Sequence, residues 1–354
     1  MRTLVVSDLH LGARTERDLL RGPVVCDALT AALPGVARLV LLGDVLELRQ
    51  SPAREALAEA EEVLTLLAAA LDPGAQVTIV AGNHDHQLVG PWLERRGRDQ
   101  APPTIGLQSA VDWRAGEPLA RIVKWLSGAG GTVDVAYPGC WLRDDVYATH
   151  GHYSDCHSTV PMFERLAAAA MARVVGERPA GPQSAEEYEA VLGPMYAWMD
   201  ALAQTGGPAL GGGSAAVWRT LAGTGRQGLC RRVAQVAFPA LVAGLNRAGL
   251  GPLSADLSID ALRRARLRAV GEVVLRLGVP ARHVVFGHSH RAGPQPADDP
   301  SEWRAATGAT LTNTGCWVQE TTFLGPEPSR SPYRPGFAVV LEDSGPPVLT
   351  NLLD

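Results

Sequence analysis

The chain is poor in cysteine, and its five cysteines never form a Cys-x-x-Cys pair. Scattered cysteines in odd number argue against a disulfide framework and against a cysteine-ligated zinc site, and they favour a reducing compartment. The sequence also lacks an apolar run long enough to cross a bilayer, since the best candidate, 233–245, contains Gln235 and Pro239. The first residues lead directly into a β-branched stretch without a targeting segment. We therefore expect a cytoplasmic protein with no transmembrane segment.

An excess of basic residues is absent as well. The 32 Lys and Arg against 37 Asp and Glu leave a net charge of −5, which gives no electrostatic footprint for non-specific binding of nucleic acid. A small phosphorylated ligand remains compatible with this charge, because a local site can be positive on an acidic protein. With 46% hydrophobic and 19% charged residues in a chain of 354, the composition is typical of a globular protein with a large core.

Several short apolar runs each end abruptly in a polar cluster that contains Asp, Asn or His. These runs are 4–6, 39–42, 77–80, 146–148 and 283–286. Both faces of each run are apolar, which is typical of buried strands. Between them lie segments with apolar residues at helical spacing, most clearly 53–71. The alternation predicts an α/β fold, in which ligands gather at the carboxyl ends of the strands. The runs 311–314, 337–341 and 348–352 predict further strands.

The segment between His150 and His288 differs in character. Residues 161–251 are rich in Ala, Gly and Arg, and helical patterns cover 162–175 and 185–203. We predict a core formed by 1–150 and 280–354 and a largely helical insertion over 151–279, whose last helix, 259–277, belongs either to the insertion or to the core. Insertions in active-site loops usually cover the site, so we expect a cap; a helical pack with no role at the site is the alternative.

The polar clusters carry residue types that bind metal ions. They are Asp8-x-His10, Gly43-Asp44, Gly82-Asn83-His84-Asp85, His150-Gly151-His152 and Gly287-His288-Ser289-His290. Each cluster alone is explained by a polar strand exit, although residues two apart in an extended segment point to the same side and can grip one cation. Together they hold six of the nine histidines, and a seventh, His86, directly follows Asp85; random placement of core histidines does not explain this.

The donor types in these clusters indicate which metals and how many. His, Asp and Asn without Cys favour Mn, Fe or Zn, and of these we favour manganese. The candidate ligands are Asp8, His10, Asp44, Asn83, His150, His288 and His290. They exceed the needs of one ion, so we predict two divalent ions that share a bridging carboxylate.

The ordered set of five motifs resembles the calcineurin-like metallophosphoesterase superfamily, over roughly residues 1–90, 140–155 and 280–320. The resemblance implies a two-layer β-sandwich flanked by helices (αββα). It also implies that Asp8, His10 and His290 bind one metal, that Asp44 bridges, and that Asn83, His150 and His288 bind the other. By the same resemblance, His84 meets the substrate and Asp85 orients it.

This constellation suits the hydrolysis of phosphate esters. The anionic ester repels hydroxide, whereas two cations clamp phosphoryl oxygens and lower the pKa of a bridging water. We predict an enzyme that hydrolyses a small phosphodiester, phosphomonoester or pyrophosphate by attack of a metal-bridging hydroxide. His84 would assist the leaving oxygen, with its imidazole kept protonated and aimed by a carboxylate; bracing of Asn83 by His84 and Asp85 is the structural alternative.

Other residues near the motifs are candidates for contact with substrate. They are Arg14, His152, Asp155 and His157. For Asp155 and His157, a capped turn that leads into the next helix is an equal alternative. For the basic run Arg263, Arg264, Arg266 and Arg268, we favour a solvated helix face over a phosphate-binding patch.

Three further functions compete with the general assignment. The stretch Asp8-Leu9-His10-Leu11 and the insertion resemble the UDP-2,3-diacylglucosamine pyrophosphohydrolase branch, which commonly carries Arg where this chain has His84. A nuclease of the same superfamily is the second alternative, and the acidic charge argues against it. A non-catalytic interaction module is the third, but such a protein should have lost ligands, and none is missing here.

Overall fold

The computed structural model describes residues 1–13, 18–128, 130–174, 176, 181–205, 228–256, 258–319, 323–325 and 327–354. Arg14, a predicted substrate contact, lies outside these residues. Within the described part of the chain, no helix combines the length and apolar character needed to span a membrane.

The predicted N-terminal runs form parallel strands. β1 (Thr3–Val6) pairs with β2 (Arg38–Leu42), and β2 pairs with β3 (Gln76–Val80), both in parallel. On the other side of β1, β9 (Phe337–Leu341) and β10 (Val348–Asn351) add antiparallel strands. Because β1, β2 and β3 run in the same direction, their carboxyl ends meet at one edge. The polar residues that follow each strand are thereby brought together.

A long strand, β5 (Thr132–Arg143), links this half of the sheet to a second half. Its first residues pair with β3 and its last residues with β6 (Val146–Thr149), while the short β4 (Gln108–Ala110) pairs with its middle. The second half continues through two parallel neighbours, β7 (His283–Phe286) and β8 (Thr310–Asn313). The complete order is β10-β9-β1-β2-β3-β5-β6-β7-β8.

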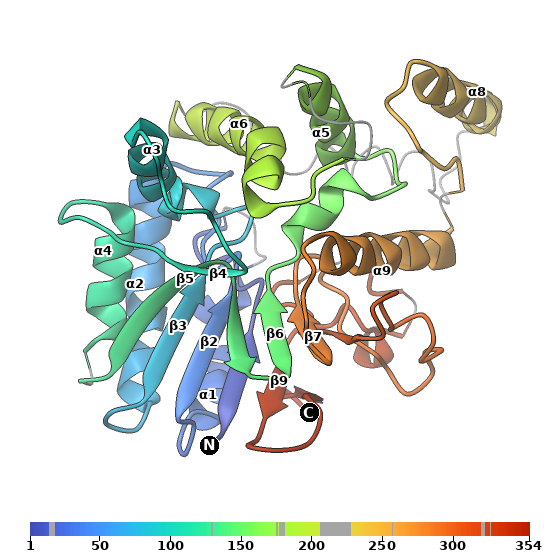
Figure 1. Ribbon diagram of the computed structural model, residues 1–354. Helices are drawn as coiled ribbons and strands as arrows, with labels where there is room; N and C mark the ends of the chain where they lie inside the picture. The colour runs from blue at the N-terminus through green and yellow to red at the C-terminus, as the bar shows by residue number, and fades with distance from the viewer. Residues whose placement is uncertain are drawn as a thin grey trace.

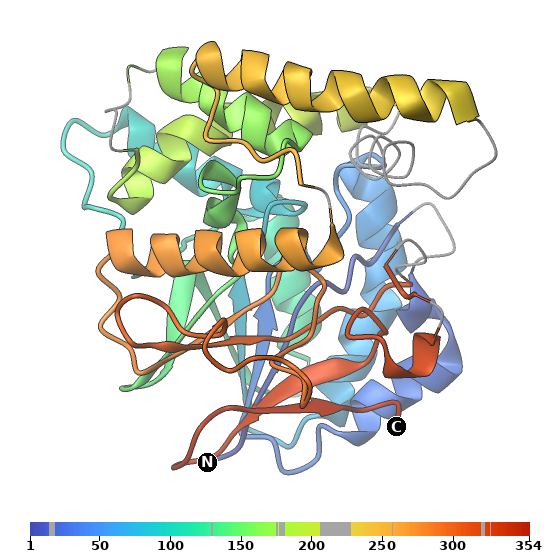
Figure 2. The ribbon, with the colours of Figure 1, turned by 90° about the vertical axis from the view of Figure 1, so that its right-hand side faces the viewer.

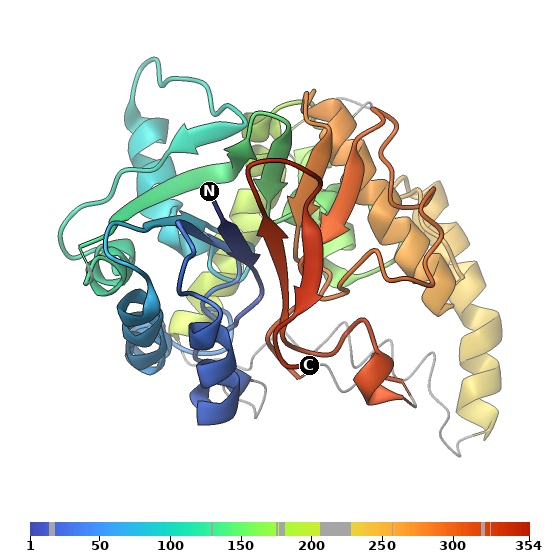
Figure 3. The same ribbon diagram turned by 90° about the horizontal axis from the view of Figure 1, so that it is seen from below.

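The two halves face each other and form a sandwich. Val40 and Val80 of the first half pack with Val146 and Val285 of the second in one buried apolar cluster. Helices cover both outer faces (Figures 1 and 3). On the first half these are α1 (Pro23–Ala31), α2 (Ala53–Ala70) and α4 (Pro118–Leu126); on the second half it is α9 (Ile259–Arg276). The predicted αββα architecture is thus confirmed, with the detail that both sheets share β5.

α9 belongs to the outer layer through its packing. Leu267, Val270 and Val274 bury their side chains against Phe286 of β7 and Leu311 of β8. These buried residues form the apolar stripe that helical spacing places on one side of α9.

The remaining helices lie over the carboxyl ends of the strands (Figure 2). A short 3-10 turn, His152–Cys156, leaves β6 and leads into α5 (Phe163–Val174), α6 (Ala185–Gln204) and α8 (Gly228–Arg247). α3 (Gly90–Arg98) follows β3 on the same end. One buried carboxylate fastens α6 to the core: Glu189 accepts hydrogen bonds from the Tyr137 and Tyr153 hydroxyls, at 2.5 and 2.7 Å, and lies 2.9 Å from His86 Nε2.

Candidate metal centre

Three predicted ligands converge at the ends of β1 and β7. The nitrogen atom His290 Nε2 lies 3.2 Å from Asp8 Oδ1 and 3.1 Å from His10 Nε2. Asp44 Oδ2, beyond the end of β2, lies 3.8 Å from the same nitrogen of His10. The donor atoms of Asp8, His10 and His290 are close enough to share one ion, and Asp44 forms a further close group with His10 and His84.

A second set adjoins the first and uses the same carboxylate oxygen. His150 Nε2 lies 3.2 Å from Asp44 Oδ2 and 3.1 Å from the side-chain amide of Asn83. That amide lies 3.0 Å from His288 Nδ1. Asp44 Oδ2 therefore borders both sets, which is the position that a bridging ligand needs.

The backbone is strained at these residues. Among the described residues, those other than glycine with positive φ are Asp8, His10, Asp44, His288 and His290, at 47–65°. The left-handed region costs an L-residue about 1–2 kcal/mol, and such strain persists mainly at functional sites. Five of the seven predicted ligands carry it, so the chain holds these side chains in place at a cost to stability.

Two glycines explain how the strand ends approach each other so closely. Gly43 has a φ of +83°, and a Cβ there would collide with the ring of His150. A Cβ at Gly82 would collide with the Asp44 carboxylate. Only glycine leaves room for the neighbouring ligand at either position.

The residues fit a pair of divalent cations. Ligand atoms bound at about 2.1 Å to one ion are separated by about 3.0–3.4 Å, close to most of the separations seen here. The donor set of imidazoles, carboxylates and one amide suits Mn, Fe or Zn. Asp8 and Asp44 are fully buried, and positive charge is what makes a pair of buried carboxylates tolerable. Burial raises the pKa of both carboxyls, but the surrounding histidines outweigh it and hold each pKa below its usual range.

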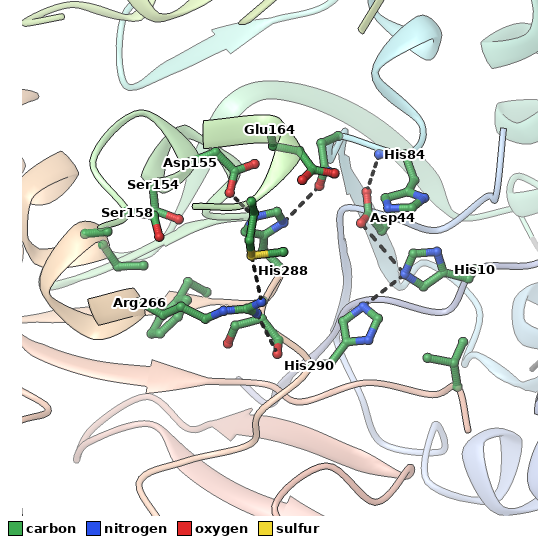
Figure 4. A pocket seen from close by; sticks show the side chains of 18 of the residues that line it. His10, Asp44, His84, Ser154, Asp155, Ser158, Glu164, Arg266, His288 and His290 are labelled. Carbon is green, nitrogen blue, oxygen red and sulfur yellow. Dashed lines mark hydrogen bonds and ion pairs between the residues drawn. The ribbon is translucent and has the colours of Figure 1, made fainter. Parts of the chain in front are cut away.

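His84 lies beside His10 and Asp44 (Figure 4), and its hydrogen-bond partner is Glu47. His84 Nδ1 is 2.8 Å from Glu47 Oε2 and 3.0 Å from Oε1. The contact fixes a proton on Nδ1 and leaves Nε2 available to a substrate. Burial and, more weakly, Arg49 lower the pKa of His84, whereas the carboxylates of Glu47 and Asp44 raise it.

The prediction that Asp85 orients His84 is wrong. The Asp85 carboxylate accepts hydrogen bonds from the backbone N–H groups of Gly82 at 2.6 Å and Val45 at 2.8 Å, with the N–H of Asp44 at 3.3 Å. Asp85 therefore ties the β2 and β3 loops together. Burial and the neighbouring Asp44 raise its pKa to about 6.

A cavity of about 180 Å³ opens onto the metal-ligand cluster. Asp155 lines it and lies 3.0 Å from His288 Nε2. Ser154, Ser158 and Met162 from the start of the insertion line it as well.

The structure corrects the predictions for two other substrate contacts. His152 is 1% exposed and lies 3.1 Å from the Tyr137 hydroxyl, and His157 lies 2.6 Å from the Tyr188 hydroxyl of α6. Neither histidine lines the cavity. His152 instead connects the insertion with the core strand β5, and His157 connects two parts of the insertion.

Sequence reasoning missed two residues of this site. Glu47 carried a signal, because it is an acidic residue within the apolar stretch 45–48 that follows Asp44. Arg266 was assigned to a solvated helix face, but it lines the cavity with Ala269 and Val270, three and four residues farther along α9. Its guanidinium donates to the Ser289 carbonyl at 3.3 Å. The helical spacing of Arg266 with Ala269 and Val270 was the signal that the sequence offered for this position.

One comparison with known proteins agrees with the geometry of the site. Residues 1–172 match the model of the calcineurin-like phosphoesterase family. No curated protein matches the chain. Among solved structures, a dimetal phosphatase from Danio rerio is similar at 12% identity over 99% of each chain, with a TM-score of 0.35; so low a score does not establish a shared fold. The family match and the five motifs confirm the predicted resemblance to the calcineurin-like phosphoesterase family, with residues 1–172 as the part that the family model matches.

Proposed function

We propose that this chain is a dinuclear, metal-dependent hydrolase of a small phosphate ester. One observation carries the proposal: donor atoms from five separate strand ends form two adjoining sets around Asp44 Oδ2. The seven ligands would be Asp8, His10, Asp44, Asn83, His150, His288 and His290. We favour Mn, with Fe and Zn as the other candidates.

The reaction needs positive charge and a nucleophile at neutral pH. When bound, two divalent ions supply both, since they stabilise phosphoryl oxygens and lower the pKa of water. His84 faces the same cavity and would assist the leaving oxygen through Nε2. Glu47 would position His84 by accepting the hydrogen bond from Nδ1.

The size and lining of the cavity favour a small substrate. A volume of about 180 Å³ is below the range of roughly 300–1,000 Å³ that drug-sized ligands need. We propose a phosphomonoester in preference to a diester or pyrophosphate, because a monoester has only one substituent to accommodate. Arg266, which borders the cavity, would contact an oxygen of the phosphate.

The same features weigh against the alternative substrates. A nucleic acid would have to reach the metals past Asp155, Glu164 and the other cavity residues contributed by the insertion, on a protein of net charge −5. A nucleotide sugar with two acyl chains exceeds the cavity volume several times. We propose that the insertion, residues 151–279, acts as a cap that excludes such molecules.

A substrate panel tests this function. The protein, stripped with a chelator and reloaded with Mn, Fe or Zn, should hydrolyse p-nitrophenyl phosphate faster than bis-p-nitrophenyl phosphate. It should leave UDP-diacylglucosamine and both single- and double-stranded DNA intact. Absence of turnover on every substrate, in protein shown to hold two ions, would refute the enzymatic proposal. A preference for DNA would replace it with a nuclease.

A further inference from the structure

The two ring nitrogens of His288 face different partners. Nδ1 lies 3.0 Å from the side-chain amide of Asn83, within the ligand cluster. Nε2 lies 3.0 Å from Asp155 Oδ1, and Figure 4 shows Asp155 on one side of the His288 ring and Asp44 on the other. An ion bound on the side of the cluster takes Nδ1 and leaves the ring proton on Nε2, because a neutral imidazole carries one proton. Asp155 is the acceptor for that proton.

Two other histidines of the ligand set show the same arrangement. His10 Nδ1 lies 3.2 Å from Glu47 Oε2, and His150 Nδ1 lies 3.0 Å from the Leu42 carbonyl oxygen. An acceptor on the outer nitrogen of a metal-bound imidazole fixes the tautomer and the orientation of the ring, and it makes the ligand more basic. Both of these acceptors belong to the core, whereas Asp155 lies in the first turn of the insertion.

His288 depends on its acceptor more than His150 does. The His150 side chain is fully buried, and Gly43 and Gly82 pack directly against its ring. The His288 side chain is 17% exposed. Close packing therefore confines the ring of His150, whereas the ring of His288 has free space on one side and is held there by its hydrogen bond to Asp155.

The Asp155 side chain has no other hydrogen-bond partner among the described residues. Its Oδ2 atom is buried and lacks a partner there. An aspartate that caps a turn accepts a hydrogen bond from a backbone N–H, but the turn that contains Asp155 begins at Gly151 without a side-chain cap. The carboxylate is thus not required by the turn itself, and the contact with His288 is the role that its position supports.

The helix α6 holds this turn in place. The Tyr153 ring stacks on the Tyr188 ring of α6, with centroids 4.5 Å apart and an angle of 7° between the planes. The Tyr153 hydroxyl donates to Glu189 of the same helix at 2.7 Å. Because Tyr153 is two residues before Asp155, these contacts fix the backbone that carries the carboxylate. The packing of α6 therefore determines where the acceptor for His288 lies.

We propose that Asp155 is a positioning residue of the metal centre, through which the insertion helps to bind the ion at His150 and His288. This inference rests on the proposed dinuclear function. Asp155 holds the His288 ring in the tautomer and orientation that bind this ion, and the ion of the other ligand set does not depend on it. A direct contact with substrate, the role predicted from sequence, is the competing assignment for Asp155.

Calorimetric titration of the metal-free full chain with Mn tests the proposal without turnover. The wild-type protein should bind two ions. Asp155→Ala removes the acceptor and should weaken the binding of one ion about 10–100-fold, while the other ion keeps its affinity. Asp155→Asn is isosteric and retains a neutral acceptor oxygen, so its affinity should lie between those of the wild type and Asp155→Ala, and it carries the test if Asp155→Ala fails to fold.

Asp200→Asn is the matched control. It makes the same substitution in the same insertion, on α6, at a residue outside the wall of the metal cavity. It should bind both ions with wild-type affinity. Circular dichroism of each metal-free variant establishes that it is folded before its affinities are compared.

The outcomes separate this inference from the proposed function. A wild-type protein that binds fewer than two ions would refute the dinuclear function, and the inference with it. Two ions bound with wild-type affinity by folded Asp155→Ala would overturn the inference alone. Equal weakening of both ions in the Asp155 variants would also overturn it, because that result indicates a general loss of structure at the site.

Kinetics distinguish positioning of His288 from contact with substrate. At saturating Mn, when both ions are bound, Asp155→Ala should hydrolyse p-nitrophenyl phosphate with an unchanged KM. A raised KM together with wild-type affinity for both ions would make Asp155 a substrate contact and overturn the inference.

Discussion

Replacement of Glu47 by glutamine tests the assignment of the His84 partner most sharply. Glu47 Oε2 lies near three nitrogen atoms: His84 Nδ1 at 2.8 Å, Gln50 Nε2 at 3.1 Å and His10 Nδ1 at 3.2 Å. Its other oxygen accepts from the backbone N–H of Arg49 at 3.0 Å. If the glutamine oxygen keeps the bond to Arg49, its NH₂ group faces three nitrogens that the carboxylate had satisfied.

The size of the effect follows from these contacts. A hydrogen bond to a charged group contributes about 1.5–3 kcal/mol, and each 1.36 kcal/mol of lost transition-state stabilisation is tenfold in rate. We therefore expect kcat to fall roughly 10²-fold at saturating Mn. The lost contact with His10 should also weaken metal binding by about 10–100-fold, so kcat is compared only after the metal concentration has been raised to saturation.

Asp85→Asn is the matched control. It removes one acceptor oxygen from a carboxylate that binds backbone N–H groups, so it should lower the free energy of unfolding by about 1–3 kcal/mol and change kcat less than threefold. If Glu47 acts through His84, the double variant Glu47→Gln/His84→Ala should be no slower than His84→Ala alone. Full kcat in Glu47→Gln, or losses that multiply in the double variant, would refute this account.

Three further predictions concern catalysis, pH and the insertion. His84→Ala should retain both ions by elemental analysis and lose about 10²–10⁴ in kcat; unchanged kcat would exclude His84 from the reaction. Burial, with nearby arginines, lowers the pKa of His157 to about 3, below its unfolded value near 6.5. The free energy of unfolding should therefore fall by about 2 kcal/mol between pH 7 and 5, because the unfolded chain takes up a proton at this histidine and the folded chain does not. Urea unfolding of His157→Gln should show a correspondingly smaller loss between these two pH values, and an equal loss would contradict this. Glu189→Ala leaves two buried hydroxyls and an imidazole without their acceptor and should lower the free energy of unfolding by about 3 kcal/mol, whereas Glu187→Ala should cost less than 1 kcal/mol; equal costs would show that Glu189 does not hold α6 to the core.

The ligand cluster could be predicted because its information is local. Each ligand follows directly after a strand, and parallel pairing of β1, β2 and β3 forces their carboxyl ends together. The positive φ angles of Asp8 and Asp44 were not predictable, because neither residue type requires them. They arise only when the complete set of loops closes around one point.

The contacts of His84 and Asp85 depend on the turn between them. The two residues are adjacent in sequence, and adjacency suggested that the carboxylate aims the imidazole. In the folded chain the Asp85 side chain instead turns toward the backbone of the β2 loop, and Glu47, distant in sequence, reaches His84. Sequence patterns report spacing along the chain and not the direction in which a side chain leaves a turn.

The strand β5 was also missed. Its residues 132–143 include Pro138 and Gly139, which normally argue against a strand interior. Pro138 is tolerated near the point where β5 changes partners, between its pairing with β3 and its pairing with β6. Tertiary pairing on both sides outweighs the weak local signal. Arg266 was misplaced for a similar reason, since only the packing of α9 on β7 and β8 shows which face is buried.

The account as a whole depends on two ions held in contact with Asp44. Anomalous scattering at the manganese edge, from crystals grown with Mn, measures this directly. We predict two peaks about 3.5–4 Å apart, one beside Asp8, His10 and His290 and the other beside His150 and His288. A single peak, or peaks remote from Asp44, would contradict the dinuclear centre.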